Sequence, residues 1–233
     1  MKTIGLIGGM SWESTLQYYR LINETIKDRL GGLHSAKIIL YSVDFHDIER
    51  LQQACDWEAA GALLAGAARS LEGAGSDFLV LCTNTLHKVA PRIEAAVAIP
   101  LLHIADPTAA EIKRAGYSKV GLLGTRFTME QAFYRERLSE RHGLQVIIPD
   151  AEDRHAIHRI IFEELCLGST LPESRSACRS IMGRLASQGA EAIILGCTEI
   201  SLLVTQQDSE VPLFDTTTLH ARAAAEQALA ATP

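Results

Sequence analysis

The chain has 233 residues, 47% of them hydrophobic, and a formal net charge of -6. This length allows a core that needs neither disulfides nor metals, and the lack of a basic cluster argues against nucleic-acid and membrane-surface partners. Five cysteines without CxxC spacing predict neither a disulfide framework nor a zinc site. The N-terminus enters a strand-like run at once and no apolar stretch reaches the length of a membrane span, so we expect a cytoplasmic protein with a small soluble ligand.

Short β-branched runs alternate with longer stretches of helical spacing along the whole chain. The expected strands are, in chain order, residues 3–8, 37–45, 78–82, 119–124, 144–149 and 192–197. Apolar residues run through these segments without alternation, as in parallel sheets whose two faces are covered by helices. The pattern predicts an α/β protein built from βαβ units.

The sequence also contains an internal repeat. IGLIGGMSWESTLQYY aligns with VGLLGTRFTMEQAFYR, SLEGAGSDFLVLCTNT with RLASQGAEAIILGCTE, and IPLLHIAD with VPLFDTTT, in the same order along the chain. We therefore expect two pseudo-symmetric, Rossmann-like α/β lobes with parallel sheets and an active site between the lobes. The expected lobes are residues 1–112 and 113–211, with a strand and helix in 212–233 that pack back on the first lobe.

The repeat also decides which side chains the two halves present to a ligand. Open parallel sheets bind ligands at the carboxyl ends of their strands, and successive side chains of a strand point to opposite faces. In the alignment Thr83 matches Cys197, whereas Cys82 matches Gly196. We therefore expect Thr83 and Cys197 to line the site and Cys82 to point elsewhere.

Three segments, IILGCTEISLL, LCTNTLH and GLIGGMSWEST, resemble motifs of the aspartate/glutamate racemase family, and the likeness runs along essentially the whole chain. The resemblance implies two similar α/β domains, no cofactor, and one acid/base residue from each domain on opposite faces of the substrate α-carbon. In most members both residues are cysteines. Here Thr83 precedes Asn84 and Thr85, which is similar to the L-aspartate/glutamate-specific subgroup. The implied function is cofactor-independent racemisation of L-aspartate and/or L-glutamate.

The chemistry of racemisation explains why two groups are needed. One group removes the α-proton and the other returns a proton to the opposite face. A thiol, whose pKa is ordinarily about 8.5, can be held as a thiolate by nearby donors and then acts as the base. The hypothesis is that Cys197 abstracts the α-proton of the L-amino acid and Thr83 reprotonates the other face. The reverse reaction should be slower, because Thr83 would have to start as an alkoxide.

Further site residues follow from the resemblance. Substrate-binding roles are expected for residues next to the two strand ends and in the first turn, namely Met10, Asn84, Thr85, Thr198 and Glu199. Glu199 is a candidate ligand for the substrate ammonium, an orienting partner or a simple helix-start acid. Family members supply basic residues for a distal carboxylate, but the corresponding positions here are Gln52 and Glu164, with Arg50 and Arg126 as alternative cations. His87 and His103 are either buried structural residues or groups that tune a thiol.

Several alternatives stay open on the sequence. Maleate isomerases, arylmalonate decarboxylases and hydantoin racemases share a similar scaffold and at least one of the cysteines. A non-catalytic dicarboxylate-binding protein would not need Cys197 at all. NAD and phosphate chemistry are disfavoured, because neither GxGxxG spacing nor a P-loop is present. We expect no metal, no nucleic-acid or membrane partner, and a homodimer for which the helix STLQYYRLIN is a candidate interface.

Overall fold

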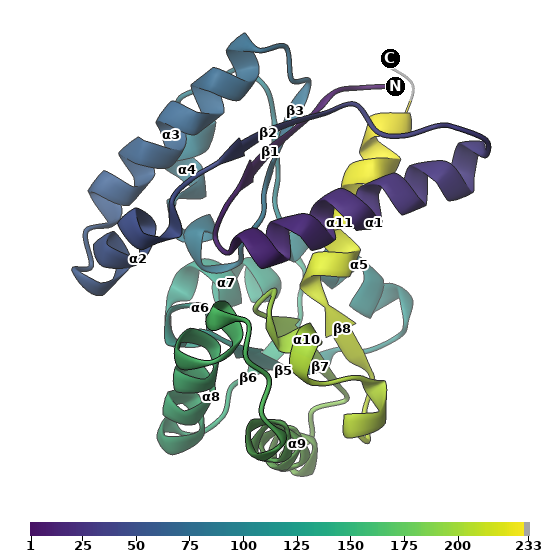
Figure 1. The fold of residues 1–233 in the computed structure, drawn as a ribbon. Helices are drawn as coiled ribbons and strands as arrows, with labels where there is room; N and C mark the ends of the chain where they lie inside the picture. Colours follow the sequence, from purple (N-terminus) through teal and green to yellow (C-terminus); the bar gives the residue numbers. More distant parts are fainter. Residues whose placement is uncertain (231–233) are drawn as a thin grey trace. The chain divides into compact units, whose positions relative to one another are not determined.

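The computed structural model describes residues 1–230, which form two compact units. Unit 1 contains Met1–Ile104 and the C-terminal residues from His220, and unit 2 contains Ala105–Leu219. Each unit has one four-stranded parallel sheet with helices packed against it (Figure 1). This confirms the predicted pair of α/β lobes with parallel sheets.

The elements of unit 1 follow each other as alternating strands and helices. They are β1 (Ile4–Gly8), α1 (Trp12–Leu30), β2 (Ile38–Ser42), α2 (Phe45–Gln53), α3 (Trp57–Gly73), β3 (Phe78–Leu81), the 3-10 turn η1 (Thr85–Val89), α4 (Ala90–Glu94) and β4 (Leu101–Leu102). The last helix, α11 (Thr216–Leu229), begins in unit 2 and continues into unit 1. Residues 231–233 of the expected C-terminal segment lie outside the described residues.

Unit 2 repeats this order with more irregular helices. Its elements are α5 (Ala105–Arg114), β5 (Lys119–Gly124), α6 (Arg126–Glu130), α7 (Ala132–Glu136), the π-helical turn η2 (Arg137–Arg141), β6 (Gln145–Ile147), α8 (Ala151–Glu163), the 3-10 turn η3 (Leu165–Leu167), α9 (Pro172–Ser187), β7 (Ala192–Gly196), α10 (Ile200–Leu203), the 3-10 turn η4 (Gln206–Asp208) and β8 (Leu213–Asp215).

Two hydrophobic cores enclose the sheet of unit 1. On one face Ile4, Leu6 and Val80 pack against Tyr18 of α1 and against alanines of α11, while the other face packs against α3 and α4 (Figure 1). The alanines leave room for α11 to approach α1 and the sheet closely. The C-terminal helix therefore packs on unit 1, which is where the repeated strand pattern places it.

The two sheets have equivalent strand orders, β2-β1-β3-β4 and β6-β5-β7-β8. In register, Ile7 of β1 lies beside Leu81 of β3, and Gly124 of β5 lies beside Gly196 of β7. The loops that follow these neighbouring strands therefore leave the same edge of each sheet. Tyr18 and Tyr134, which the repeat aligns, are both fully buried. The internal repeat thus corresponds to a structural duplication.

Strand β2 departs from the expectation that helices cover both faces of every strand. It is an edge strand, and its residues Leu40 and Tyr41 are exposed. The residues of β1, β3 and β7, by contrast, are buried throughout. Apolar runs therefore occur in the inner strands and in this edge strand alike. Such a run alone does not show whether a strand lies inside the sheet or at its edge.

The units divide at 104/105 and 219/220, whereas the expected lobes divide at 112/113 and 211/212. Helix α5 belongs to unit 2, because its Asp106 accepts hydrogen bonds from Arg137 at 2.7 and 2.6 Å and lies 2.9 Å from Nε2 of His142. A contact between side chains this far apart in sequence leaves no local signal in the chain.

Candidate active site

The first half of the candidate site follows β3 in unit 1. The Thr83 N–H donates to the Leu81 carbonyl at 2.8 Å, which closes a tight turn about Cys82 at the end of the strand. Cys82 is fully buried in the core against Tyr18 and the alanines of α11, and burial raises the pKa of its thiol. Cys82 is therefore a packing residue, as the register argument predicts. Thr83 is 7% exposed.

The loop after β1 leaves the same sheet edge. Gly9 has φ +92°, and a Cβ there would lie 2.3 Å from the Val43 carbonyl oxygen, so only glycine fits. The Gly9 N–H donates to the Thr15 hydroxyl, and Ser11 caps α1 by accepting from the Ser14 N–H. Met10 is 3% exposed and packs in the core with Ile7. The structure thus gives Met10 a packing role, and its contact with substrate stays a prediction.

The other expected ligands of unit 1 are also buried. Asn84 and Thr85 are 3% and 5% exposed and begin the η1 turn. Gln52, at the end of α2, is 2% exposed, and its Oε1 has no hydrogen-bond partner among residues 1–230. A buried amide oxygen without a partner is unfavourable by about 1–3 kcal/mol. Gln52 is therefore available to a ligand or to water.

The second half of the candidate site follows β7 in unit 2. The Cys197 thiol donates to Glu199 Oε2 at 3.0 Å, and the Thr198 hydroxyl donates to the same oxygen at 2.7 Å. All three side chains are at most 6% exposed. The consecutive residues Cys-Thr-Glu thus form one buried acid and thiol cluster directly after the strand.

Burial raises the pKa of the Cys197 thiol well above its ordinary value, and the negative charge of Glu199 raises it further. The backbone N–H of Glu199 lowers the pKa of Cys197, but burial and the Glu199 carboxylate raise it by more, so the net effect of the surroundings disfavours the thiolate that the sequence hypothesis needs. Glu199 is the group placed to take the thiol proton.

In unit 2, the position that is expected to bind the distal carboxylate of the substrate carries an acidic residue. Glu164 is the C-cap residue directly after α8, and its Oε2 is buried with no hydrogen-bond partner among the described residues. The alternative cation Arg126 is exposed, and its guanidinium lies 5.6 Å from the Phe127 ring. Arg50, in unit 1, is exposed as well. Within residues 1–230, neither arginine forms an ion pair with a carboxylate that would fix the position of its guanidinium.

The family assignment rests on a match over nearly the whole chain. The model of the Asp/Glu/hydantoin racemase family matches residues 7–224, which include both strand ends described above. The chain belongs to the Asp/Glu/hydantoin racemase family. It is accordingly an isomerase with amino-acid racemase activity.

Individual members agree with this assignment. The crystal structure of a candidate Asp/Glu racemase from Yersinia pestis shares 62% identity and a TM-score of 0.92, covering 99% of this chain and 100% of that one. An aspartate racemase homologue from Pyrococcus horikoshii shares 37% identity and a TM-score of 0.84 over 99% and 100% of the two chains. The broad specificity amino-acid racemase RacX of Bacillus subtilis is 29% identical over 74% of each chain.

The racemase carries two structural features that sequence reasoning missed. The His87 ring contacts the Thr83 carbonyl rather than a thiol, and Glu199 shares its oxygen between Cys197 and Thr198. The spacing of His87, four residues after Thr83 in a predicted helical turn, was the available signal for the first contact. The adjacency of Glu199 to Cys197 was the signal for the second.

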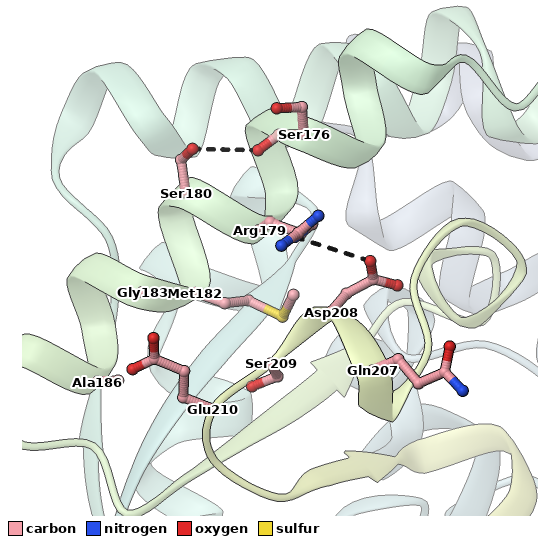
Figure 2. Close-up of a pocket in the computed structure, with 10 residues that line it drawn as sticks. All are labelled: Ser176, Arg179, Ser180, Met182, Gly183, Ala186, Gln207, Asp208, Ser209 and Glu210. Carbon is pink, nitrogen blue, oxygen red and sulfur yellow. Dashed lines mark hydrogen bonds and ion pairs between the residues drawn. The ribbon is translucent and has the colours of Figure 1, made fainter.

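A separate hollow of about 470 Å³ lies on unit 2 of the racemase, between α9 and residues 207–210 (Figure 2). Figure 2 shows the Arg179 guanidinium directed at Asp208, 3.8 Å away, and the Ser180 hydroxyl directed at the Ser176 carbonyl. Four of the polar residues that line the hollow therefore pair with each other. None of the expected site residues lines it, and we assign it no ligand.

Residues 1–230 of the racemase contain neither a metal-binding cluster nor a membrane-spanning helix. Histidine, cysteine and acidic side chains do not gather there in groups of three or more that would hold a metal ion. None of the helices in the same residues combines the length and the apolar character needed to cross a bilayer.

Proposed function

We propose that the chain is a cofactor-independent racemase of L-aspartate and/or L-glutamate in which Cys197 and Thr83 handle the α-proton. The observation that carries the proposal is the hydrogen bond from the Cys197 thiol to the buried Glu199 carboxylate. It supplies what a thiol of raised pKa needs before it can act as a base, namely an adjacent proton acceptor. The equivalent place in the other half of the repeat is held by Thr83, whose hydroxyl is a proton donor.

In the first step Glu199 Oε2 takes the thiol proton, and the S–H electron pair stays on sulfur. The Cys197 sulfur then takes the α-proton of the L-amino acid, and the electrons of the Cα–H bond remain on the carbon. A buried site favours this transfer, because water does not compete for the sulfur. Cys197 ends the step as a thiol, and Glu199 ends it as a carboxylic acid.

In the second step Thr83 gives its hydroxyl proton to the opposite face of the carbanion, which yields the D-amino acid. Solvent returns a proton to Thr83, and Glu199 releases one to solvent, so the enzyme regains its starting state. Because an alkoxide is needed for the reverse direction, proton removal from the D-isomer is slower. The equilibrium constant between enantiomers is one, so kcat/KM is equal for the two isomers, and the slower kcat for the D-isomer is matched by a proportionally lower KM.

Substrate binding is assigned to both halves of the repeat. The α-carboxylate and α-ammonium groups are assigned to Asn84, Thr85 and Thr198, and Glu199 serves as the proton acceptor and orienting partner of Cys197. Met10, Gln52 and Glu164 are assigned to the substrate side chain. The carboxylate of Glu164 disfavours a second substrate carboxylate. Substitution of Glu164 therefore tests whether the substrate is a dicarboxylic amino acid.

We also propose that the chain works in the cytoplasm, without nucleic-acid or membrane partners, as a homodimer. Three large apolar side chains on one face of α1, those of Trp12, Leu16 and Tyr19, are 62%, 57% and 55% exposed. Exposed apolar patches of this kind commonly bind another protein. A second copy of the chain can cover the patch with the same patch of its own.

Proton NMR in D2O tests the reaction. Purified protein without added cofactor should remove the α-proton signal of L-aspartate or L-glutamate, and the D-isomer should appear. Cys197→Ser should lower the exchange rate by at least about 10³-fold, because a serine hydroxyl is a far weaker acid and a poor base at neutral pH. Cys55→Ser, which changes an exposed cysteine, should leave the rate unchanged.

Two results would contradict the proposal. Full exchange in Cys197→Ser would exclude Cys197 as the base. Deuterium entering L-isomer and D-isomer at equal rates would exclude the asymmetric roles of Cys197 and Thr83. A substrate that loses carbon dioxide or isomerises a double bond would instead indicate one of the related family reactions.

A further inference from the structure

The His87 side chain lies directly behind Thr83 in unit 1. His87 is 2% exposed and belongs to the η1 turn. Its Nδ1 lies 2.7 Å from the Thr83 carbonyl oxygen, and the Ile104 N–H points at its Nε2 at 3.2 Å. The ring therefore connects the loop after β3 to the segment after β4.

These two contacts assign the tautomer of His87. A backbone N–H can only donate, so Nε2 must accept and carries no hydrogen. Nδ1 then carries the hydrogen and donates it to the Thr83 carbonyl. The ring is neutral in this arrangement, and both of its nitrogens are used by the backbone.

Other buried titratable groups surround the ring. The His103 ring centroid lies 4.3 Å from that of His87, and the His220 ring centroid lies 6.0 Å away. His220 Nε2 must donate to the Leu102 carbonyl at 2.9 Å, so its Nδ1 accepts from the Tyr18 hydroxyl, also at 2.9 Å. His87 thus sits in a packed arrangement of rings contributed by η1, α1, α11 and the end of β4.

The contact restrains the backbone of Thr83. The Thr83 N–H is already held by the Leu81 carbonyl, and His87 holds the Thr83 carbonyl, so both backbone groups of Thr83 are restrained. Restraining both groups restrains the Cα–Cβ bond between them. We propose that His87 is a positioning residue that aims the Thr83 hydroxyl for proton delivery. This inference rests on the proposed function of Thr83.

Three replacements of His87 separate its two hydrogen bonds. His87→Asn places an amide at the position of Nδ1 and keeps the donor to Thr83. His87→Gln places an amide at the position of Nε2 and keeps only the acceptor for the Ile104 N–H. His87→Phe keeps the ring and removes both hydrogen bonds. Thr83→Ala gives the limit in which proton delivery from residue 83 is lost altogether.

The measurement compares two rates for the L-substrate in D2O. Loss of the α-proton signal reports proton removal by Cys197, and chiral chromatography reports formation of the D-isomer. In His87→Phe and His87→Gln the ratio of D-isomer formation to α-proton loss should fall at least about 10-fold. A displacement of the proton donor by about 1 Å already slows proton transfer strongly. The α-proton loss itself should change little, and His87→Asn should restore the ratio.

A merely structural role predicts a different result. Both rates would then fall together, in proportion to the fraction of folded protein, and the ratio would not change. An unchanged ratio in His87→Phe therefore overturns the proposal. The effect of His87→Phe must act through Thr83, so it should disappear in a protein that already carries Thr83→Ala. If His87→Phe lowers the ratio in Thr83→Ala by the same factor as in the wild type, the proposal is overturned as well.

A second measurement does not depend on activity. Crystal structures of the wild type and of His87→Phe should show the Thr83 hydroxyl displaced in the variant, and a Thr83 side chain that stays in place overturns the inference. If the wild type removes no α-proton from any amino acid, the proposed function fails, and the crystallographic comparison alone decides the role of His87.

Discussion

At the residue scale, Glu199 controls the chemistry of Cys197. A carboxylate beside a buried thiol keeps the sulfur protonated at rest and offers a place for the proton when substrate arrives. This arrangement protects the sulfur from oxidation and alkylation, since the thiolate is the reactive form. The same carboxylate therefore disfavours the reactive thiolate at rest and, in the proposed reaction, accepts the thiol proton when substrate is bound.

Replacing Glu199 with glutamine separates these two effects. The variant keeps the shape of the side chain and removes its charge, so the pKa of the Cys197 thiol should fall toward its ordinary value. A thiol of raised pKa becomes a thiolate only at high pH, and a lowered pKa moves that change to lower pH. At fixed alkaline pH, iodoacetamide should therefore alkylate Cys197 faster in Glu199→Gln than in the wild type. The racemisation kcat should fall about 10²-fold, because the proton acceptor is lost.

The exposed Cys55 provides an internal control for this comparison, because its alkylation rate should be the same in both proteins. Peptide mapping by mass spectrometry distinguishes the two sites. Slower alkylation of Cys197 in Glu199→Gln would mean that the carboxylate activates the resting thiol, contrary to the raised pKa.

Glu164 is the residue that fits the proposed dicarboxylic substrate least well, because it is acidic where a basic residue is expected. Its buried Oε2 has no hydrogen-bond partner in the part of the chain that the structure describes, and a negative charge there repels a second substrate carboxylate. Glu164→Lys should lower the KM for L-aspartate and L-glutamate by about 10-fold, and Glu164→Gln should lower it less. Steady-state kinetics with both substrates, and with L-alanine as the neutral reference, measure the effect.

The ratio between acidic and neutral substrates decides the interpretation. A KM that changes equally for L-glutamate and L-alanine would indicate a general change of the site rather than a charge effect. A KM that does not change for any of the three would place Glu164 away from the substrate.

The pairing of Thr83 with Cys197 on one substrate stays a prediction. The sequence did predict equivalent positions after β3 and β7, because the internal repeat determines them, and Cys82 lies in the core beside Tyr18. The sequence did not predict the resting state of Cys197. Whether a neighbour of a cysteine donates or accepts depends on how the turn after the strand folds, and the spacing of Cys-Thr-Glu does not specify this. The partner of His87 was missed for the same reason.

At the element scale, an ion pair between the half-exposed Arg175 and the buried Asp208 holds α9 to the η4 turn. Asp208 has a side chain that is 4% exposed, and it accepts from Arg175 at 2.8 to 3.0 Å and from the Thr205 N–H at 2.9 Å. The hydrogen bond with Arg175 lowers the pKa of Asp208 to about 2. The segment that leads from α10 to β8 therefore depends on one carboxylate.

Asp208→Asn should lower the free energy of unfolding by about 1–2 kcal/mol at pH 7. This range is smaller than the pKa shift alone would give, because solvent screens the exposed Arg175. The folded pKa lies below the ordinary value near 3.8, so the ionised carboxylate stabilises the fold above that value. The stabilisation is lost as the pH falls through about 2. The difference between wild type and variant should shrink over this range, which urea unfolding at several pH values measures.

Asp56→Asn is a suitable control, because Asp56 caps α3 through the Ala59 N–H and asparagine caps equally well. Its stability should follow that of the wild type at every pH. A difference for Asp208→Asn that stays constant from neutral pH to about pH 2 would show that the charge of Asp208 does not contribute.

Strands were predicted better than their surroundings. Each expected apolar run contains an observed strand, because β-branched residues and turn-forming flanks are local signals. The exposure of β2 was not predictable in this way. It depends on which strand occupies the sheet edge, and the strand order is a property of the whole unit.

At the scale of the whole molecule, duplication explains why equivalent positions carry different acids and bases. Two copies of one βαβ arrangement present equivalent positions after β3 and β7, and each copy is free to carry its own residue there. Thr83 and Cys197 differ strongly in acidity, so the proposed reaction has a preferred direction of proton removal. The placement of all of α5 in unit 2 was missed, because the ion pair of Asp106 with Arg137 joins elements that are distant in sequence.

The proposed homodimer gives a final prediction at this scale. Trp12, Leu16 and Tyr19 follow one another at helical spacing on α1, and all three side chains are exposed. Burying this apolar face against a second copy would remove it from water. The double variant Leu16→Arg, Tyr19→Arg should raise the dimer dissociation constant at least about 100-fold, because two charges would be buried without partners. Leu33→Arg, at a fully exposed leucine outside α1, should leave the constant unchanged. Sedimentation equilibrium measures both, and a wild type that sediments as a monomer at micromolar concentration would contradict the homodimer.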